Sequence, residues 1–162
     1  MKLKGNIIVF TVFFIIFFQF NNHSQSFQRE IEALSKGSDV VLTGKVIKQE
    51  SEWTQNKSRI ITKTTIQVDE YLKGSAGTGT VVVNHPGGEV DGVGELYSHM
   101  PEFKNNEEVL LFLKKDKKSP DFKVFSGEDG KIPLMRNAAG EKVTPSNISL
   151  GVIKNRIKSY TD

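Results

Sequence analysis

The alternation of apolar and polar residues predicts a series of short strands between two helices. The segment RIITKTTIQVDEYLKG alternates most regularly, because Ile60, Ile66 and Val68 fall on one face and Lys63 and Asp69 on the other. A period of two is typical of a half-buried antiparallel strand. The β-branched segments DVVLTGKVIKQE and TVVVN and the apolar run EEVLLFLKK also have the composition of strands. DFKVFSGEDGKIPLM is predicted to be a hairpin with GEDG at its tip.

Two segments have helical spacing instead. Phe27, Ile31 and Leu34 recur at i, i+4 and i+7, and Gly37 follows where helices commonly end. Apolar residues recur at the same spacing between positions 150 and 160. The expected order is helix, several strands, helix, and no crossover helix separates the strands, which argues against a parallel sheet. The pattern favours a mainly β fold: a small closed or partly closed antiparallel barrel with both helices packed against it.

Residues 1–26 are expected to be a signal peptide. Two lysines precede the apolar run Ile7–Phe18, which is shorter than the roughly 20 residues that span a bilayer. Ser24 and Ser26 place small residues where a cleavage site requires them. Residues 27–162 would then be a single domain, exported to the periplasm, the cell envelope or the exterior, with no membrane span after cleavage. An uncleaved membrane anchor is the alternative.

Composition narrows the classes of function. The chain contains no cysteine, which excludes disulfides, thiol catalysis, cysteine zinc sites and lipid attachment at a cysteine. The formal net charge is +3, but two of these charges belong to Lys2 and Lys4 of the expected signal peptide. The remaining chain is therefore nearly neutral, and no segment interleaves arginine with aromatic residues. We expect no nucleic-acid partner, and we interpret the lysines at positions 114–118 as a solvated strand end.

Several segments resemble a known family. SDVVLTGKVIKQES and ITKTTIQVDEYLKGSAGTGTVVV are similar to the first strands of tissue-inhibitor-of-metalloproteinases (TIMP) and netrin-like domains. The segments YLKG, PGG, MPEF and NEEVLLFL also resemble features of a group of small exported bacterial proteins. The resemblance covers residues 38–125 and implies an antiparallel five-stranded OB-like barrel. The animal inhibitors chelate zinc through an N-terminal cysteine, which this chain lacks, so the resemblance implies the fold and not the inhibitory residue.

The segment VVVNHPGGEVDGVGELYSHMPEF, residues 81–103, contains the side chains that are most able to bind a metal ion or to take part in catalysis. His85, Glu89, Asp91, Glu95 and His99 have side chains that bind zinc or manganese. Their spacing differs from His-Glu-x-x-His, and the glycines between them break any regular face. The adjacent Ser98–His99 pair does not by itself make a nucleophile and base. We therefore assign no catalytic residue, metal or cofactor from the sequence.

The middle of this segment is instead expected to be a long exposed loop of the kind that binds ligands. Pro101 and Phe103 are predicted to anchor its end against the core. Trp53 lies in the predicted turn SEWTQNKS, where an aromatic side chain can contact a partner or cover the barrel end. The candidate binding residues are Trp53, His85, Glu89, Asp91, Tyr97 and His99.

The sequence thus favours a non-enzymatic binding or inhibitor-like module that uses loops at one end of a barrel. Its expected partner is another exported protein, such as a peptidase. Two alternatives stay open: a small metal-dependent hydrolase that uses the histidine, glutamate and aspartate residues of positions 85–99, and an envelope structural protein.

Overall fold

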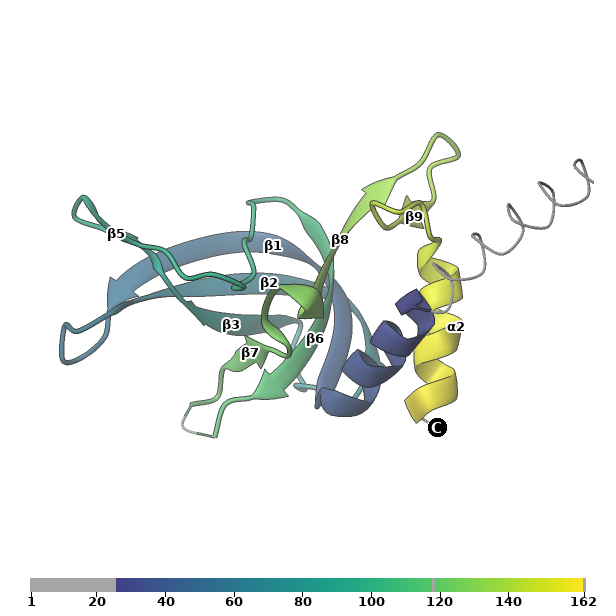
Figure 1. The fold of residues 1–162 in the computed structure, drawn as a ribbon, viewed down its shortest axis with the longest axis horizontal. Coiled ribbons are helices and arrows are strands. Elements are labelled where there is room, and N and C mark those ends of the chain that lie inside the picture. The colour runs from purple at the N-terminus through teal and green to yellow at the C-terminus, as the bar shows by residue number, and fades with distance from the viewer. Residues whose placement is uncertain (1–25, 118, 162) are drawn as a thin grey trace, which may run out of the picture.

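The computed structural model describes residues 26–117 and 119–161 and shows a mainly β fold with two helices on one side (Figure 1). The N-terminal helix covers residues 26–37, and its end at Gly37 confirms the predicted boundary. The C-terminal helix is α2 (Leu150–Thr161). The expected signal peptide lies outside the described residues except for Ser26, which is already helical. Of the helices described, none has the length and apolarity needed to cross a bilayer.

Five strands close into a barrel. They are β1 (Val40–Trp53), β2 (Ile60–Lys73), β3 (Thr80–Pro86), β7 (Phe122–Val124) and β6 (Glu108–Lys115), in this spatial order, and β6 pairs back with β1. Every pair is antiparallel except β3–β7, which is parallel. The prediction of a purely antiparallel barrel was therefore wrong. An odd number of strands cannot alternate in direction around a closed ring, so one parallel pair is unavoidable.

The other strands extend this barrel. β8 (Lys131–Arg136) pairs with β6, and β9 (Lys142–Val143) pairs with β8. The predicted hairpin across GEDG was wrong, because β7 and β8 do not pair with each other: both pair with β6, one after the other along the same strand. The GEDG residues form a short 3-10 helix, η1 (Gly127–Gly130), that carries the chain between the two pairings.

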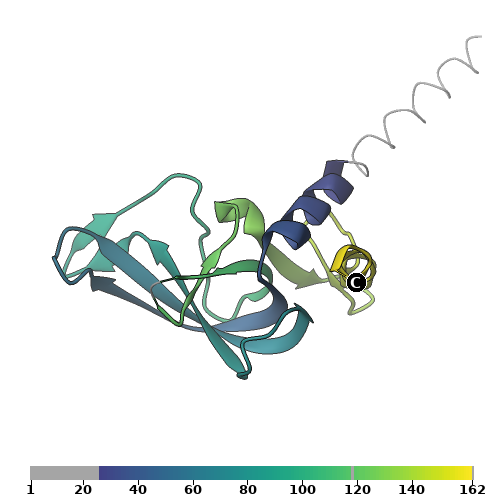
Figure 2. The ribbon, with the colours of Figure 1, turned by 90° about the horizontal axis from the view of Figure 1, so that it is seen from below.

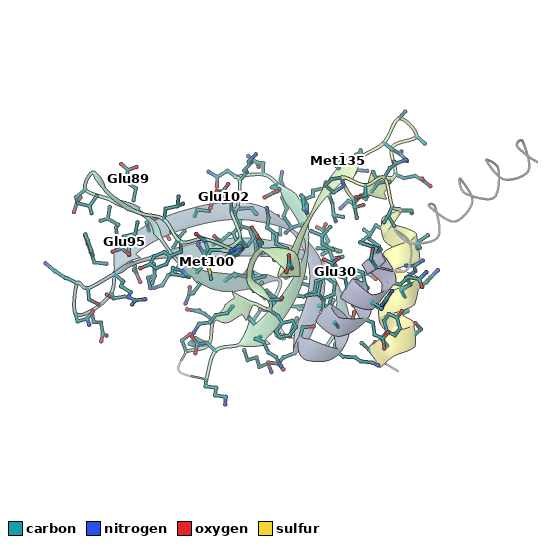
Figure 3. All side chains as sticks on the ribbon, in the orientation of Figure 1. Glu30, Glu89, Glu95, Met100, Glu102 and Met135 are labelled. Carbon is teal, nitrogen blue, oxygen red and sulfur yellow. The ribbon has the colours of Figure 1, made fainter. Side chains whose placement is uncertain are left out.

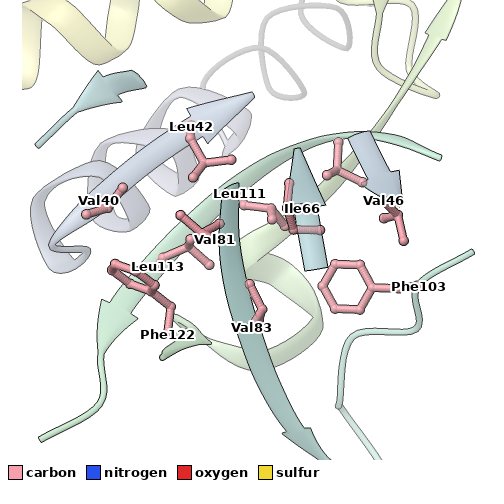
Figure 4. Packing of buried hydrophobic residues seen from close by; sticks show 11 residues of the cluster. Val40, Leu42, Val46, Ile66, Val81, Val83, Phe103, Leu111, Leu113 and Phe122 are labelled. Carbon is pink, nitrogen blue, oxygen red and sulfur yellow. The ribbon is translucent and has the colours of Figure 1, made fainter. Parts of the chain in front are cut away.

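The apolar residues form two cores that share β1 and β6. The side chains inside the barrel are those of Val40, Leu42, Val46, Ile66, Val81, Val83, Phe103, Val109, Leu111, Leu113 and Phe122 (Figure 4). Val41, Leu110 and Phe112 point the other way and pack against both helices, which lie beside the barrel (Figure 2). Both faces of β6 are therefore buried, which explains why its sequence is a continuous apolar run rather than an alternating one.

The C-terminal helix has the predicted buried stripe. Leu150, Ile153 and Ile157 are all buried against the outer face of the barrel. Ser149 precedes the helix, and its side-chain oxygen accepts a hydrogen bond from the amide of Gly151 at 3.3 Å. This is the capping role that serine commonly has at a helix N-terminus.

Candidate functional site

The segment 85–103 lies over one end of the barrel. Its first part contains a separate two-stranded hairpin, β4 (Gly88–Val90) and β5 (Val93–Glu95), at the same end as the β1–β2 connection (Figure 1). Its last part returns to the barrel through Pro101 and Phe103, which are both buried. Phe103 belongs to the barrel core, so the prediction that these two residues anchor the segment is confirmed.

Glu95 fastens the hairpin to the start of β2. One oxygen of its carboxylate accepts hydrogen bonds from the backbone amide of Ile60 and the hydroxyl of Tyr97, both at 3.0 Å. The Gly87 amide donates to the Ile60 carbonyl oxygen at 2.9 Å. The hydrogen bond to Glu95 raises the pKa of Tyr97 above its ordinary value. These contacts give Glu95 and the Tyr97 hydroxyl a structural role.

A polar row crosses three strands beneath the hairpin. Ser51 on β1 faces Thr62 on β2, and Thr62 faces His85 on β3. The Thr62 hydroxyl donates to the Gly87 carbonyl oxygen at 2.7 Å, which uses its only proton. Ser51 must therefore donate in the 2.9 Å bond between the two hydroxyls. This series of hydrogen bonds ends on the Gly87 carbonyl oxygen. It therefore provides no base that could activate Ser51 as a nucleophile.

The ring of His85 is a neutral acceptor within this row. Nδ1 lies 3.3 Å from the carbonyl oxygen of Pro86, which can only accept, so Nδ1 carries the proton. Burial lowers the pKa of His85, and the contact with Pro86 opposes this effect. Nε2 is buried and has no hydrogen-bond partner among the described residues. The ring centroid lies 5.7 Å from that of Phe103.

The lowered pKa of His85 predicts a specific loss of stability in acid. The neutral ring contributes stability above the unfolded-state pKa of about 6.5, and this contribution is lost as pH falls through the lower folded-state pKa. We expect His85→Phe to weaken this pH dependence, because phenylalanine cannot be protonated. Urea unfolding at several pH values between neutral and mildly acidic measures the effect.

His99 provides the matched control for this prediction. Its side chain is 84% exposed, and its positive φ of 60° suits asparagine, so His99→Asn removes an exposed histidine of the same segment without backbone strain. Equal acid sensitivity of wild type and His85→Phe would show that His85 is not held neutral by burial.

A groove of about 720 Å³ lies between the hairpin, the polar row and the returning segment. Its floor includes Ser51, Thr62 and His85, and we call it the barrel-end groove. The remaining lining residues are Gln49, Pro86, Gly87, Gly88, Glu89, Gly94, Glu95, Leu96, Tyr97, Met100, Pro101, Glu102 and Phe103. Two further cavities of about 460 and 410 Å³ adjoin it along the segment 96–101. Figure 3 shows Glu89 and Glu95 at the hairpin, Met100 and Glu102 nearer the middle of the barrel, and Glu30 on the N-terminal helix on the other side.

The candidate binding residues fall into two sets. His85, Glu89 and Tyr97 line the barrel-end groove, and Tyr97 also lines the 460 Å³ cavity together with His99. Trp53 and Asp91 line none of these three cavities. Trp53 is the half-buried last residue of β1, so its assignment to a turn was wrong. Asp91 lies exposed at the tip of the hairpin, with a positive φ of 53°.

The residues considered as metal ligands do not converge. His99 Nδ1 lies 3.1 Å from a carboxylate oxygen of Glu128 on η1, while Glu95 is hydrogen-bonded to β2 and Tyr97. Across residues 26–117 and 119–161, no group of three or more histidine, aspartate or glutamate side chains could hold a metal ion.

Several groove residues were missed by sequence reasoning. Ser51 and Thr62 were read as ordinary strand or turn residues, although the alternation around Thr62 already placed it on the apolar face. A hydroxyl on an otherwise apolar face is the signal that could have identified this row. Leu96 carried no motif, and Met100 was noted only as the first residue of the segment MPEF. Neither a protein-family model nor a curated protein matches this sequence.

Proposed function

We propose that this chain is an exported binding module on an OB-like barrel, related in architecture to TIMP and netrin-like domains. The closed five-stranded barrel supports this assignment, because OB-folds are five-stranded barrels that bind ligands with a strand face and the adjoining loops. The barrel-end groove is likewise lined by residues of the barrel strands and of the adjoining segment 85–103. Its volume of about 720 Å³ lies within the range of roughly 300–1,000 Å³ typical of ligand sites.

The observation that carries the proposal is the apolar character of the groove rim. Leu96 is 91% exposed, Met100 is partly exposed, and both line the groove. A large apolar side chain at such exposure gains free energy when a partner covers it. The hydrogen bonds from Ser51 to Thr62 and from Thr62 to the Gly87 carbonyl oxygen leave neither hydroxyl activated as a nucleophile. These features favour binding over hydrolysis, and the partner that we propose is a segment of another exported protein.

A bulky side chain at the hairpin edge of the groove should weaken binding. A Cβ at Gly94 would meet only the Gly88 carbonyl oxygen, at 4.0 Å, and the φ of Gly94 is not positive. Gly94→Phe should therefore place a ring on the groove wall without backbone strain. We expect peptides selected on the wild-type domain from a displayed random library to lose at least about tenfold in affinity for Gly94→Phe, the cost of roughly 1.4 kcal/mol.

Gly79 provides the matched control, since it also has no positive φ and a Cβ there meets nothing within 4 Å. Gly79→Phe lies in the β2–β3 connection, away from the groove, and should bind the selected peptides as wild type does. The proposal fails if no peptide is selected, or if the two phenylalanine variants bind equally well.

A further inference from the structure

The side chains that line the barrel-end groove can accept hydrogen bonds but have little capacity to donate them. Each side-chain N–H or O–H donor of the lining is directed at an acceptor of the protein itself; these donors are those of Gln49, Ser51, Thr62, His85 and Tyr97. Only the second hydrogen of the Gln49 amide is left over. The lone pairs of the Ser51 hydroxyl and the Gln49 carbonyl oxygen remain. A ligand group that forms hydrogen bonds with these side chains must therefore supply the protons.

The charged side chains of the lining also favour a ligand that donates hydrogen bonds. Within the described residues, three carboxylates line the groove, from Glu89, Glu95 and Glu102, and no lysine or arginine does so. Glu95 is committed to Ile60 and Tyr97, but no hydrogen bond or ion pair of the Glu89 or Glu102 side chain is seen in the described structure. Arg59 acts electrostatically on Tyr97 from the β1–β2 connection without lining the groove.

From this complementarity we propose that the barrel-end groove binds an extended polypeptide segment in which lysine or arginine stands two positions from a large apolar residue, so that both side chains face the groove. This inference rests on the proposed binding function and adds the chemistry of the partner. The cationic group would pair with the carboxylate of Glu89 or of Glu102, where charge-assisted hydrogen bonds are favoured. The apolar residue would cover Leu96 and Met100.

The shape of the surface favours an extended polypeptide over a small amine. The barrel-end groove and the two adjoining cavities meet at Met100 and Pro101, which line all three. Each adjoining cavity is also lined by one lysine, Lys131 or Lys123, and both lysines are paired with carboxylates of the protein. A segment in extended conformation rises about 3.3 Å per residue and places alternate side chains on the same face. It can therefore fill successive depressions while the aliphatic stem of lysine or arginine covers apolar surface.

A titration with designed peptides tests this inference. The probe is an acetylated and amidated peptide of about eight residues in which leucine and arginine alternate at every second position, with serine between them, roughly 26 Å long when extended. A second peptide carries citrulline, a neutral analogue of arginine, and a third carries glutamate. We expect the arginine peptide to bind, the citrulline peptide to bind about tenfold or more weakly, and the glutamate peptide not to bind. Isothermal calorimetry at low salt measures all three, because exposed charges are screened at high salt.

Variants of the protein test whether Glu89 and Glu102 are the groups that bind the arginine side chains. Glu89→Gln with Glu102→Gln should weaken the arginine peptide about fivefold to thirtyfold and leave the citrulline peptide unchanged. Glu30→Gln with Glu141→Gln makes the same change in charge at exposed sites outside the groove and should have little effect. Equal binding of the arginine and citrulline peptides, no binding of the arginine peptide, or equal effects of the two double variants would overturn the inference.

These outcomes can be separated from failure of the proposed function. If library peptides bind in a way that Gly94→Phe blocks, but neither arginine nor the two glutamates matter, the groove binds ligands of a different chemistry. If Gly94→Phe does not weaken the binding of the library peptides, the groove is not the binding surface and both proposals fail. If free arginine competes as well as the arginine peptide at equal concentration, the ligand is a small cation and the polypeptide is excluded.

Discussion

Replacing Phe103 by alanine is expected to lower the free energy of unfolding by about 3–5 kcal/mol, the usual cost of removing a buried aromatic side chain. Phe103 is 8% exposed and belongs to the barrel core, although it comes from a loop. Its ring also lies beside His85 and beneath the ammonium group of Lys131, at 5.3 Å from the ring centroid. The substitution would therefore open the barrel end and release the segment that forms one wall of the groove. Urea unfolding at neutral pH measures the loss.

Leu96 is the matched control because it lies in the same segment and is also apolar, but is 91% exposed. Leu96→Ala should change the free energy of unfolding by no more than about 0.5 kcal/mol. If Phe103→Ala lowered the free energy of unfolding no more than Leu96→Ala does, the returning segment would not be part of the barrel core.

Gly88→Ala is expected to destabilise the fold by about 2–4 kcal/mol and to displace the β4–β5 hairpin. Gly88 has a φ of 128°, a conformation essentially restricted to glycine. A Cβ at this position would also overlap the hydroxyl oxygens of Ser51 and Thr62, so the hydroxyl pair beneath the hairpin would have to separate. Amide hydrogen exchange should show faster exchange of the hairpin, in addition to the lower stability in urea.

Gly94 lies in the same hairpin and is the control for this effect. Its φ is not positive and a Cβ there has room, so Gly94→Ala should be neutral to within about 0.5 kcal/mol. Similar losses for the two alanine variants would mean that the hairpin is not seated on the polar row through Gly88.

The sequence predicted the elements of this fold better than their connections. The helical spacing of Ile31 and Leu34 and the apolar run of residues 109–113 correspond to buried positions in the structure. These patterns are local, so a single strand or helix is enough to reveal them. The pairing of β7 and β8 with β6 depends on residues far apart along the chain, and the GEDG segment imitates a hairpin tip without forming one.

The candidate site was predicted only in part for the same reason. His85 and Tyr97 were chosen for their side chains, and both line the groove. Ser51 was missed because the first strand was expected to end at Glu50, whereas β1 continues to Trp53 and brings Ser51 opposite Thr62. Irregularities in the β1–β2 register further prevent the facing residues from being found by counting from the turn.

The central claim is that the barrel-end groove is the binding surface of this chain. Its most direct test is a map of amide chemical shifts of the domain during titration with the leucine–arginine peptide. We predict saturable shifts concentrated in residues 49–51, 62 and 85–103, with little change in α2 or at the β6–β7 connection. Shifts concentrated on α2 or on the β6–β7 connection, or no saturable shifts at all, would contradict the claim.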